Sequence, residues 1–215
     1  GAQLAEAMKT HDPRLTRDML RRRAITLLED VRIANPEHTI MSYPHALSGG
    51  MRQRIGIAMA LANDPDIIIA DEPTTALDVT VQAQVLRILD DLRRKKGVGL
   101  IFISHDLNVV SQISDRIAVM YAGQIVECGP STDVLEQPAH PYSRALLASS
   151  PQIGAGGGLP KPIDGGLPRA DDLPAGCAFA ARCEMATEIC SASAVELRSS
   201  ASREVRCVKW EAANG

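Results

Sequence analysis

The sequence reads LSGGMRQR at residues 47–54 and DIIIADEP at residues 66–73. In the first stretch, Ser48 and two glycines precede a basic helical pattern. The N–H groups and the positive dipole at such a helix start attract phosphate. The second stretch is a short apolar strand that ends in Asp71 and Glu72. One carboxylate can bind Mg²⁺ and the other can act as a base toward water. Together the two stretches predict nucleotide chemistry.

Half of a nucleotide site is nevertheless missing from this sequence. The phosphate loop G-x-x-x-x-G-K-[ST] requires a Gly-Lys dipeptide, and the 215 residues contain none. The chain also begins with Gly1 and leads directly into a helical pattern. We therefore expect a piece of a longer protein, without the half that first binds the phosphates.

The composition argues against several classes of protein. A net charge of −3 gives no general attraction to nucleic acid or anionic lipid, and 3% aromatic residues argue against base stacking. We therefore expect no nucleic-acid partner. No apolar run approaches the roughly 18 residues of a membrane span, and the first residues lack the pattern of a signal peptide. We expect a soluble chain inside the cell.

Hydrophobic periodicity predicts three parts along the chain. They are a helical subdomain with the LSGG stretch at residues 1–62, an α/β region at 63–130 and a C-terminal extension at 131–215. Apolar strands are predicted at 67–70, 98–103 and 117–121. An amphipathic helix closed by Gly97 lies between the first two strands. This alternation indicates a parallel sheet covered on both faces, of which only about half is encoded. Residues 151–176 are rich in Gly and Pro and are typical of a linker.

The two opening stretches together resemble the signature and Walker B motifs of the ATP-binding subunits of ABC transporters. The family's signature reads L-S-G-G-Q-R-Q-R, and this chain differs only by Met51 in place of the first glutamine. The resemblance implies an α/β fold, a partial P-loop NTPase (ABC ATPase) fold with a helical subdomain and a cysteine-containing C-terminal extension. It also implies ATP and Mg²⁺ as cofactors. The residues implied to cover ATP held by a second subunit are Ser48, Gly49, Gly50, Met51 and Gln53.

The same resemblance gives roles to residues at and after the acidic strand. Asp71 is implied to hold Mg²⁺, and Glu72 to polarise the attacking water. His105 matches the switch histidine, which contacts the γ-phosphate, although a lone histidine is more often a packed or exposed side chain. The tetrapeptide at residues 75–78 matches the D-loop, which crosses the dimer interface in this family; in isolation it reads as a helix cap. The D-loop residues implied at that interface are Ala76, Leu77 and Asp78.

A third stretch, PAHPYSRALL at residues 138–147, points to one branch of this family. It resembles the H-P-Y-T-R-x-L-L segment that follows the ATPase core in importers of oligopeptides, dipeptides and nickel. The resemblance implies a subunit that powers peptide import as a peripheral protein on the cytoplasmic face of the membrane. The implied partners are a second ABC ATPase subunit, in a homodimer or heterodimer, transmembrane permease subunits and, indirectly, an extracytoplasmic solute-binding protein.

Three alternatives stay open at this stage. The chain can belong to a nickel importer, since nickel and peptide importers share these motifs. It can be a non-catalytic ABC-derived dimerisation or regulatory fragment. It can also derive from an ABC protein of DNA repair or translation, although no long coiled-coil insertion or second cassette supports that reading. In every case we expect the isolated chain to be inactive as an ATPase, because the phosphate loop is absent.

Four of the five cysteines lie close together in the sequence, at Cys177, Cys183, Cys190 and Cys207. Their spacing is not that of a zinc ribbon, and the reducing cytosol expected for an ATPase disfavours disulfides. The segment GCAFAARC at residues 176–183 resembles the cysteine tail of the peptide-importer branch. There, four thiolates can hold a [4Fe–4S] cluster. The resemblance implies such a cluster on these four cysteines, with Cys128 apart; free structural thiols are the alternative.

Overall fold

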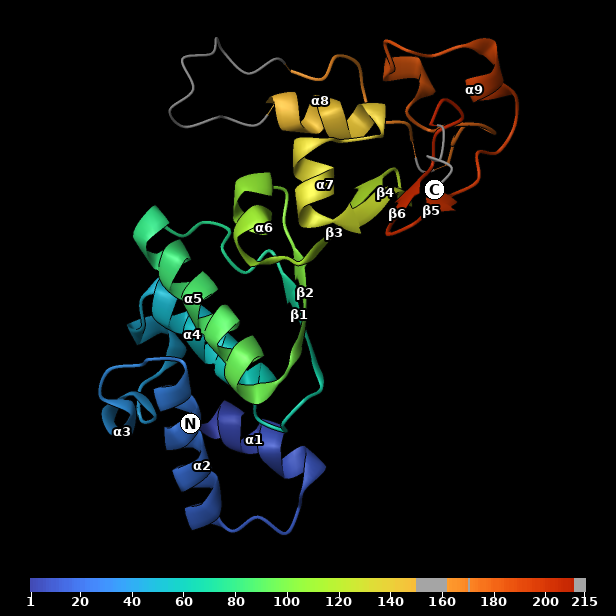
Figure 1. Ribbon diagram of the computed structural model, residues 1–215. Helices are drawn as coiled ribbons and strands as arrows, with labels where there is room; N and C mark the ends of the chain where they lie inside the picture. The colour runs from blue at the N-terminus through green and yellow to red at the C-terminus, as the bar shows by residue number, and fades with distance from the viewer. Residues whose placement is uncertain (150–161, 170, 211–215) are drawn as a thin grey trace. The chain divides into compact units, whose positions relative to one another are not determined.

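The protein is described here by a computed structural model that covers residues 1–149, 162–169 and 171–210. The chain forms two compact units, Gly1–His105 and Asp106–Gly215 (Figure 1). We call them the first and the second unit and describe each by itself. Most of the predicted linker, and the residues 150–151 that follow the PAHPYSRALL helix, lie outside the described residues. The predicted division at residues 62 and 130 stays a prediction.

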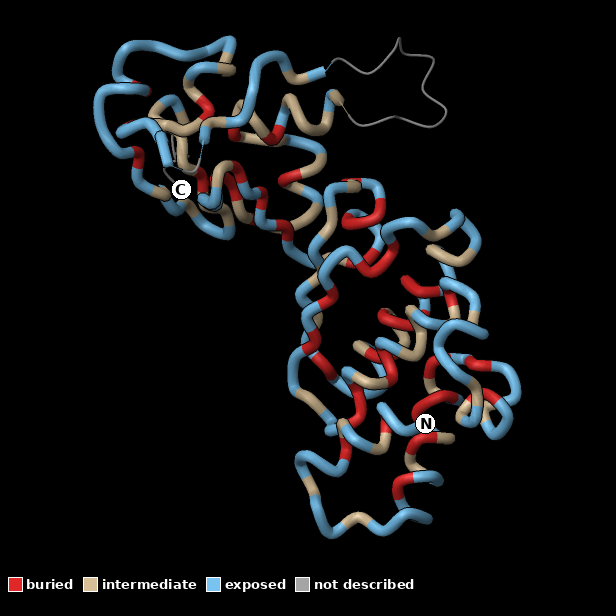
Figure 2. The backbone as a smooth tube through the Cα atoms, turned by 180° about the vertical axis from the view of Figure 1, so that it is seen from behind, coloured by how far each residue is buried: buried red, intermediate tan, exposed pale blue. Residues whose placement is uncertain are grey.

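Helices dominate the beginning of the first unit. Their bounds are α1 (Ala2–His11), α2 (Arg17–Asp30), α3 (Pro36–Thr39), the 3₁₀ helix η1 (Pro44–Ala46) and α4 (Gly49–Ala60). Thr16 starts α2, because its hydroxyl accepts the N–H of Met19 at 3.3 Å. Buried positions recur along these helices (Figure 2), and the apolar side chains that they bury include Leu4, Met8, Leu27, Leu28 and Ile57. The predicted helical subdomain is therefore a packed helical layer.

A strand–helix–strand unit completes the first unit. Strand β1 (Ile67–Asp71) pairs in parallel with β2 (Gly99–Ile103), with Ile67 opposite Gly99 and Asp71 opposite Ile103. Helix α5 (Val79–Lys96) connects them and buries one apolar face, which consists of Val85, Leu86, Ile88, Leu89 and Leu92. Gly97 ends the helix with φ 68°, a left-handed conformation that glycine adopts without strain. The predicted helix and its glycine stop are confirmed.

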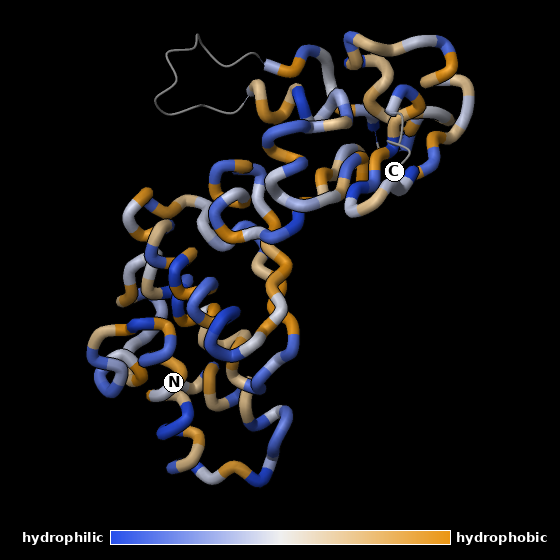
Figure 3. The backbone as a smooth tube through the Cα atoms, viewed as in Figure 1, coloured by the Kyte–Doolittle hydropathy of each residue, from blue (hydrophilic) through white to orange (hydrophobic). Residues whose placement is uncertain are grey.

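Within the described residues the parallel sheet is covered on one face only, and the prediction of cover on both faces of the whole sheet stays a prediction. Ile68 and Ala70 of β1 are buried, but a row of isoleucines on β1 and β2 is 46–66% exposed, namely Ile67, Ile69, Ile101 and Ile103. Apart from Asp71 at the end of β1 and Gly99 at the start of β2, the residues of both strands are apolar (Figure 3). An apolar run of this kind is typical of strands buried on both sides. In the first unit it is buried on one side only.

The second unit contains an antiparallel sheet. Its elements are α6 (Leu107–Ile113), β3 (Arg116–Tyr121), β4 (Gln124–Pro130), α7 (Ser131–Glu136), α8 (Pro141–Ser149), η2 (Ala180–Arg182), α9 (Glu188–Ala192), β5 (Arg198–Ser200) and β6 (Arg203–Val205). The strand order is β3-β4-β6-β5, and each neighbouring pair is antiparallel. The strand predicted at 117–121 therefore exists, but its assignment to the parallel sheet is wrong. The reason is the turn at Ala122-Gly123, whose φ values of 47° and 78° suit a two-residue hairpin.

An aromatic cluster forms part of the core of the second unit. The ring of Tyr121 lies 4.6 Å from that of Tyr142 and 5.3 Å from that of Phe179, centroid to centroid. The guanidinium of Arg182 lies over the Tyr121 ring at 5.9 Å and donates to the carbonyl groups of residues 163 and 164. These contacts hold strand β3, helix α8 and the cysteine-rich tail together. None of the helices in the described ranges is long and apolar enough to cross a membrane.

Candidate functional site

The signature stretch forms the start of helix α4. Ser48 is the residue before the helix, and its hydroxyl accepts the N–H of Met51 at 3.3 Å. Gly50 is buried where α4 passes α5, and a Cβ atom at this position would lie 2.5 Å from Cγ1 of Val81. A Cβ atom on Gly49 would lie 3.8 Å from Cδ2 of Leu77. Gly50 therefore lets α4 approach α5 closely, whereas the contact at Gly49 has room for a Cβ atom.

The predicted D-loop leads into helix α5. Asp78 caps this helix, because its carboxylate accepts the N–H of Val81 at 2.9 Å. The capping role that the tetrapeptide suggests by itself is thus confirmed. Ala76 has a positive φ of 61°, a conformation that costs a residue with a side chain about 1–3 kcal/mol and is frequent at functional sites. The role of Ala76, Leu77 and Asp78 at a dimer interface stays a prediction.

The two acidic residues lie where strand β1 ends. Asp71 is the last residue of the strand and is exposed. Glu72 follows with a positive φ of 48°, and its N–H donates to the carbonyl of Ile103 at 3.0 Å. This hydrogen bond ties the end of β1 to the end of β2. It places the two carboxylates at the sheet edge where parallel sheets bind their ligands.

His105 meets Glu72 at this edge. Nδ1 of His105 lies 2.8 Å from Oε1 of Glu72, and the Thr75 hydroxyl donates to Oε2. The hydrogen bond from His105, and then that from Thr75, lower the pKa of Glu72. Glu72 is therefore a carboxylate at neutral pH, held in one orientation by two donors. It can orient a water molecule or accept a proton. The predicted proximity of His105 and Glu72 is confirmed; their catalytic roles stay predictions.

The four clustered cysteines line one pocket of the second unit. The pocket has a cavity volume of about 20 Å³ and is lined by Cys177, Cys183, Cys190, Cys207, His140, Pro141, Phe179 and Met185, among others. All five cysteines are unpaired, and Cys128 does not line this pocket. Among the described residues, however, no group of three or more His, Cys, Asp or Glu side chains is arranged to hold a single metal ion.

Backbone contacts bring two of these cysteine segments together. The N–H of Cys177 donates to the carbonyl of Cys190 at 2.7 Å. A Cβ atom on Gly176 would lie 2.3 Å from that same carbonyl oxygen, so this crossing requires a glycine. Burial raises the pKa of Cys177 and of Cys183, and the charges of the neighbouring sulfurs raise it further. A hydrogen bond with Thr187 lowers the pKa of Cys190. Without a cation the first two groups are therefore thiols.

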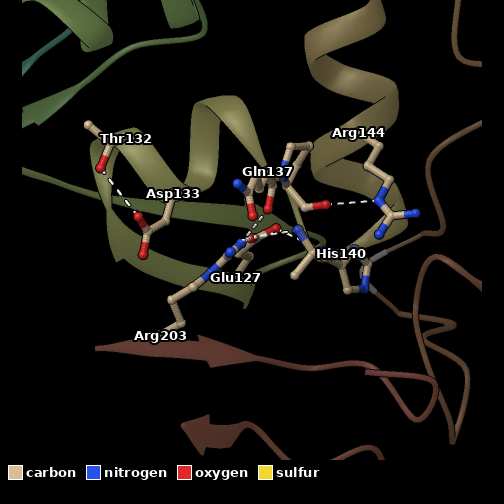
Figure 4. Close-up of polar contacts among 9 residues, drawn as sticks. Glu127, Thr132, Asp133, Gln137, His140, Arg144 and Arg203 are labelled. Atoms are coloured by element: carbon tan, nitrogen blue, oxygen red, sulfur yellow. Dashed lines mark hydrogen bonds and ion pairs between the residues drawn. The ribbon is translucent and has the colours of Figure 1, made fainter. Parts of the chain in front are cut away.

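A buried ion pair lies beside this pocket, and the sequence patterns did not reveal it (Figure 4). Glu127 of β4 is 0% exposed. Its carboxylate accepts the N–H groups of Ala139 and His140, each at 2.9 Å, and pairs with Arg203 of β6. Arg203 also donates to the carbonyl of Gln137 at 2.8 Å. Glu127 thus fixes the turn that precedes helix α8.

The comparisons with known proteins define the class first. The family model of the ABC transporter matches residues 3–75, which include the signature stretch and both acidic residues. The model of the oligopeptide/dipeptide transporter C-terminal region matches residues 126–190, which include the turn before α8 and three of the four clustered cysteines. The chain belongs to the ATP-binding proteins of the ABC transporter family, with a partial P-loop NTPase fold.

Relatives then place the chain in the oligopeptide/dipeptide branch of that family. The dipeptide transport ATP-binding protein DppD of Bacillus subtilis is 48% identical over 88% of this chain and 56% of its own length. DppD of Haemophilus influenzae is 47% identical over 96% of this chain and 62% of its own length. The oligopeptide transport ATP-binding protein OppD of Mycobacterium bovis is 44% identical over 100% of this chain and 36% of its own length. A solved dimeric ABC transporter cassette is 32% identical over 54% of this chain and 49% of its own, with a TM-score of 0.49.

Proposed function

We propose that this chain is the signature and Walker B half of an ATPase subunit that powers peptide import. The observation that carries the proposal is the Glu72–His105 pair at the edge of the parallel sheet, in the same unit as the Ser48-capped signature helix. The chain spans only 56–62% of the DppD relatives named above. The relatives' names favour peptides over nickel and an ATPase subunit over a regulatory fragment.

The signature residues of this chain act on an ATP molecule that the phosphate loop of a second subunit holds. The Ser48 hydroxyl and the N–H groups of Gly49 and Gly50 cover the γ-phosphate, because a helix start favours anions. Met51 and Gln53, one turn along, complete the cover. At the opposite half of the sandwich, Glu72 orients the water that attacks ATP held by the phosphate loop of its own subunit, and His105 holds Glu72 in place. The exposed carboxylate of Asp71 suits Mg²⁺, which prefers oxygen ligands and supplies positive charge to the phosphates when bound.

The partners follow from the same proposal. Ala76, Leu77 and Asp78 meet a second ATPase subunit, in a homodimer or a heterodimer. The helical subdomain at residues 1–62 transmits dimer closure to transmembrane permease subunits, which receive peptide from an extracytoplasmic binding protein, and the subunit is peripheral on the cytoplasmic face. The exposed isoleucines of β1 and β2 support the presence of a further part of the protein on that face of the sheet.

The test uses the full-length protein with its partner subunits. Glu72→Gln is expected to lower ATP turnover by about 10²- to 10⁴-fold while ATP binding is kept, which traps a closed dimer. Ser48→Arg is expected to prevent closure, because it adds bulk and charge at the shared interface. Glu136→Gln, at an exposed position on α7, is the matched control. Normal turnover by the Ser48→Arg protein, or turnover by residues 1–215 alone that Glu72→Gln abolishes, would overturn the proposal.

We propose further that the cysteine pocket holds a [4Fe–4S] cluster. The observation in favour is that four cysteines from separate segments line one pocket, while Cys128 does not. Four cysteine thiolates would be the ligand set that such a cluster takes. The positive iron would also stabilise the thiolate forms of Cys177 and Cys183, whose pKa values burial raises.

Anaerobic purification tests this cofactor. The protein is expected to be brown and to contain iron and inorganic sulfide. Cys183→Ser is expected to lose most of the iron, and Cys128→Ser, outside the pocket, to keep it. Anaerobic protein without iron, or a Cys128→Ser protein that loses iron as readily as Cys183→Ser, would show that the four cysteines are packing residues.

A further inference from the structure

A short turn joins the Glu72 carboxylate to the first residue of the predicted D-loop. The turn runs from Glu72 to Thr75 and is closed by a backbone hydrogen bond, in which the N–H of Thr75 donates to the carbonyl of Glu72 at 3.2 Å. Pro73 and Thr74, which lie between them, are buried, whereas Glu72 and Thr75 are exposed. The middle of the turn is therefore anchored in the first unit, and its two ends face outward.

The side chains at the two ends of this turn are joined to each other. The hydroxyl of Thr75 donates to Oε2 of Glu72, and Nδ1 of His105 lies 2.8 Å from Oε1. Each carboxylate oxygen thus has one protein partner and keeps the capacity to accept a further hydrogen bond. The Glu72 side chain is 40% exposed, so a water molecule can reach it. The carboxylate is held at both oxygens and is still open to water.

The two partners of Glu72 come from different parts of the first unit. His105 follows strand β2, whose last residue, Ile103, accepts the N–H of Glu72. Thr75 instead begins the predicted D-loop, and its hydroxyl reaches back to the carboxylate three positions earlier. One partner of Glu72 is thus tied to the parallel sheet. The other belongs to the loop that the proposed function places against a second subunit.

The backbone is strained on both sides of Thr75. Glu72 has a φ of 48° and Ala76 a φ of 61°, and neither is a glycine. Left-handed conformations of residues with a Cβ atom persist only where the surrounding structure imposes them, and they cluster at functional sites. The strain therefore lies on either side of the residue that holds the Glu72 carboxylate.

We infer that Thr75 is a positioning residue for ATP hydrolysis. Its hydroxyl holds the Glu72 carboxylate in the orientation in which that carboxylate directs the attacking water. This inference rests on the proposed function and adds a residue to it. The role requires only a hydroxyl donor at this position, so serine fulfils it. Valine, which has nearly the shape of threonine but no donor, does not.

The experiment measures single-turnover ATP hydrolysis by the full-length protein with its partner subunits. Thr75→Val is expected to lower the rate constant about 10- to 100-fold, as the loss of a hydrogen bond to a charged group does, and to leave the Kd for ATP unchanged. Thr75→Ser is expected to stay close to wild type, because its hydroxyl can make the same hydrogen bond. Thr132→Val, at an exposed position on α7, is the matched control and is expected to keep the wild-type rate.

Two double variants test whether Thr75 acts through Glu72. Glu72→Ala removes the acceptor, so adding Thr75→Val to it is expected to lower the single-turnover rate no further. Glu72→Gln is expected to trap the ATP-bound dimer, and Glu72→Gln with Thr75→Val is expected to form that dimer equally well. A residue needed only for contact with the second subunit would weaken the trapped dimer.

Three results would overturn the inference. The first is a wild-type rate in Thr75→Val. The second is an additive loss when Thr75→Val is combined with Glu72→Ala, which would show that Thr75 acts independently of Glu72. The third is loss of the trapped dimer in Glu72→Gln with Thr75→Val, which would make Thr75 an interface residue. Normal turnover by Glu72→Gln alone would instead refute the proposed function, so the two failures are distinguishable.

Discussion

The buried Glu127 carboxylate is expected to be the most sensitive single position of the second unit. Glu127→Ala leaves the Arg203 guanidinium, which is 17% exposed in its side chain, without its ion-pair partner. It also leaves the N–H groups of Ala139 and His140 without acceptors. Breaking a buried ion pair typically costs about 3–5 kcal/mol. Because such costs are not additive with those of the two N–H groups, we expect a loss of about 3–5 kcal/mol in the free energy of unfolding.

Denaturant unfolding followed by tryptophan fluorescence measures this loss. Trp210 is the only tryptophan of the chain and lies in the second unit, so its signal reports on that unit. Glu127→Gln is expected to fall between wild type and Glu127→Ala, because an amide oxygen accepts a hydrogen bond but carries no charge. Glu136→Ala, at an exposed position on α7, is the control and is expected to change stability by less than about 0.5 kcal/mol.

A double-mutant cycle separates the contribution of the Glu127–Arg203 ion pair from that of the two backbone hydrogen bonds to Glu127. Glu127→Met together with Arg203→Met is expected to cost less than the sum of the two single substitutions, because neither then leaves a buried charge. A loss below about 1 kcal/mol in the free energy of unfolding for Glu127→Ala would refute the proposed stabilising role of the Glu127 carboxylate. So would a cycle in which the two substitutions are additive.

Three further outcomes are expected. Gly50→Ala is expected to destabilise the first unit by about 1–3 kcal/mol, because its Cβ atom would lie 2.5 Å from Cγ1 of Val81, and Val81→Ala is expected to restore most of this loss in thermal unfolding. Asp78→Ala removes the cap of α5 and is expected to cost about 1 kcal/mol by the same assay. Because the pKa of His140 is lowered to about 4 in the folded state, the unfolded state binds more protons between pH 6.5 and 4, and stability is expected to fall by up to about 3 kcal/mol across that window. Urea midpoints measured along this pH range should be flatter in His140→Gln.

Local chemistry made the elements of the first unit predictable from the sequence. Ser48 before two glycines, and Gly97 after an amphipathic run, are cap residues whose preferences do not depend on the rest of the fold. The proximity of His105 to Glu72 followed from one topological fact, that parallel strands end at the same edge. What the sequence could not give was the cover of the sheet. The presence of an isoleucine in a strand does not indicate whether a helix or solvent lies against its side chain.

The error over strand β3 has a different cause. Its apolar pattern fits either sheet, and pairing is decided by how the chain leaves the strand. The turn at Ala122-Gly123 was visible in the sequence, and two residues are too few for a parallel crossover. The length of this two-residue connection predicts an antiparallel hairpin.

The burial of Glu127 could not be predicted from the sequence, because a bulge interrupts the alternation of buried and exposed residues in β4. Strand β4 carries an extra residue opposite the step from Val119 to Met120 of β3, so Val126 and Glu127 are both buried. In an unbroken strand the residue after a buried valine points to the other face. Bulges of this kind often direct a side chain to a functional place, and here the bulge directs a carboxylate at the turn before α8.

The four clustered cysteines line one pocket, and backbone contacts contribute to their convergence. Bringing together thiolates that are spread along about 30 residues costs ordering entropy, which a bound metal can repay. The structure shows a second cause, because the Cys177–Cys190 backbone hydrogen bond and the close approach at Gly176 already bring two segments together. The backbone thus meets part of the ordering cost before any cluster is present. Loss of iron should then loosen the tail less than Gly176→Val, which blocks that crossing, and protease sensitivity of the two proteins would separate the two causes.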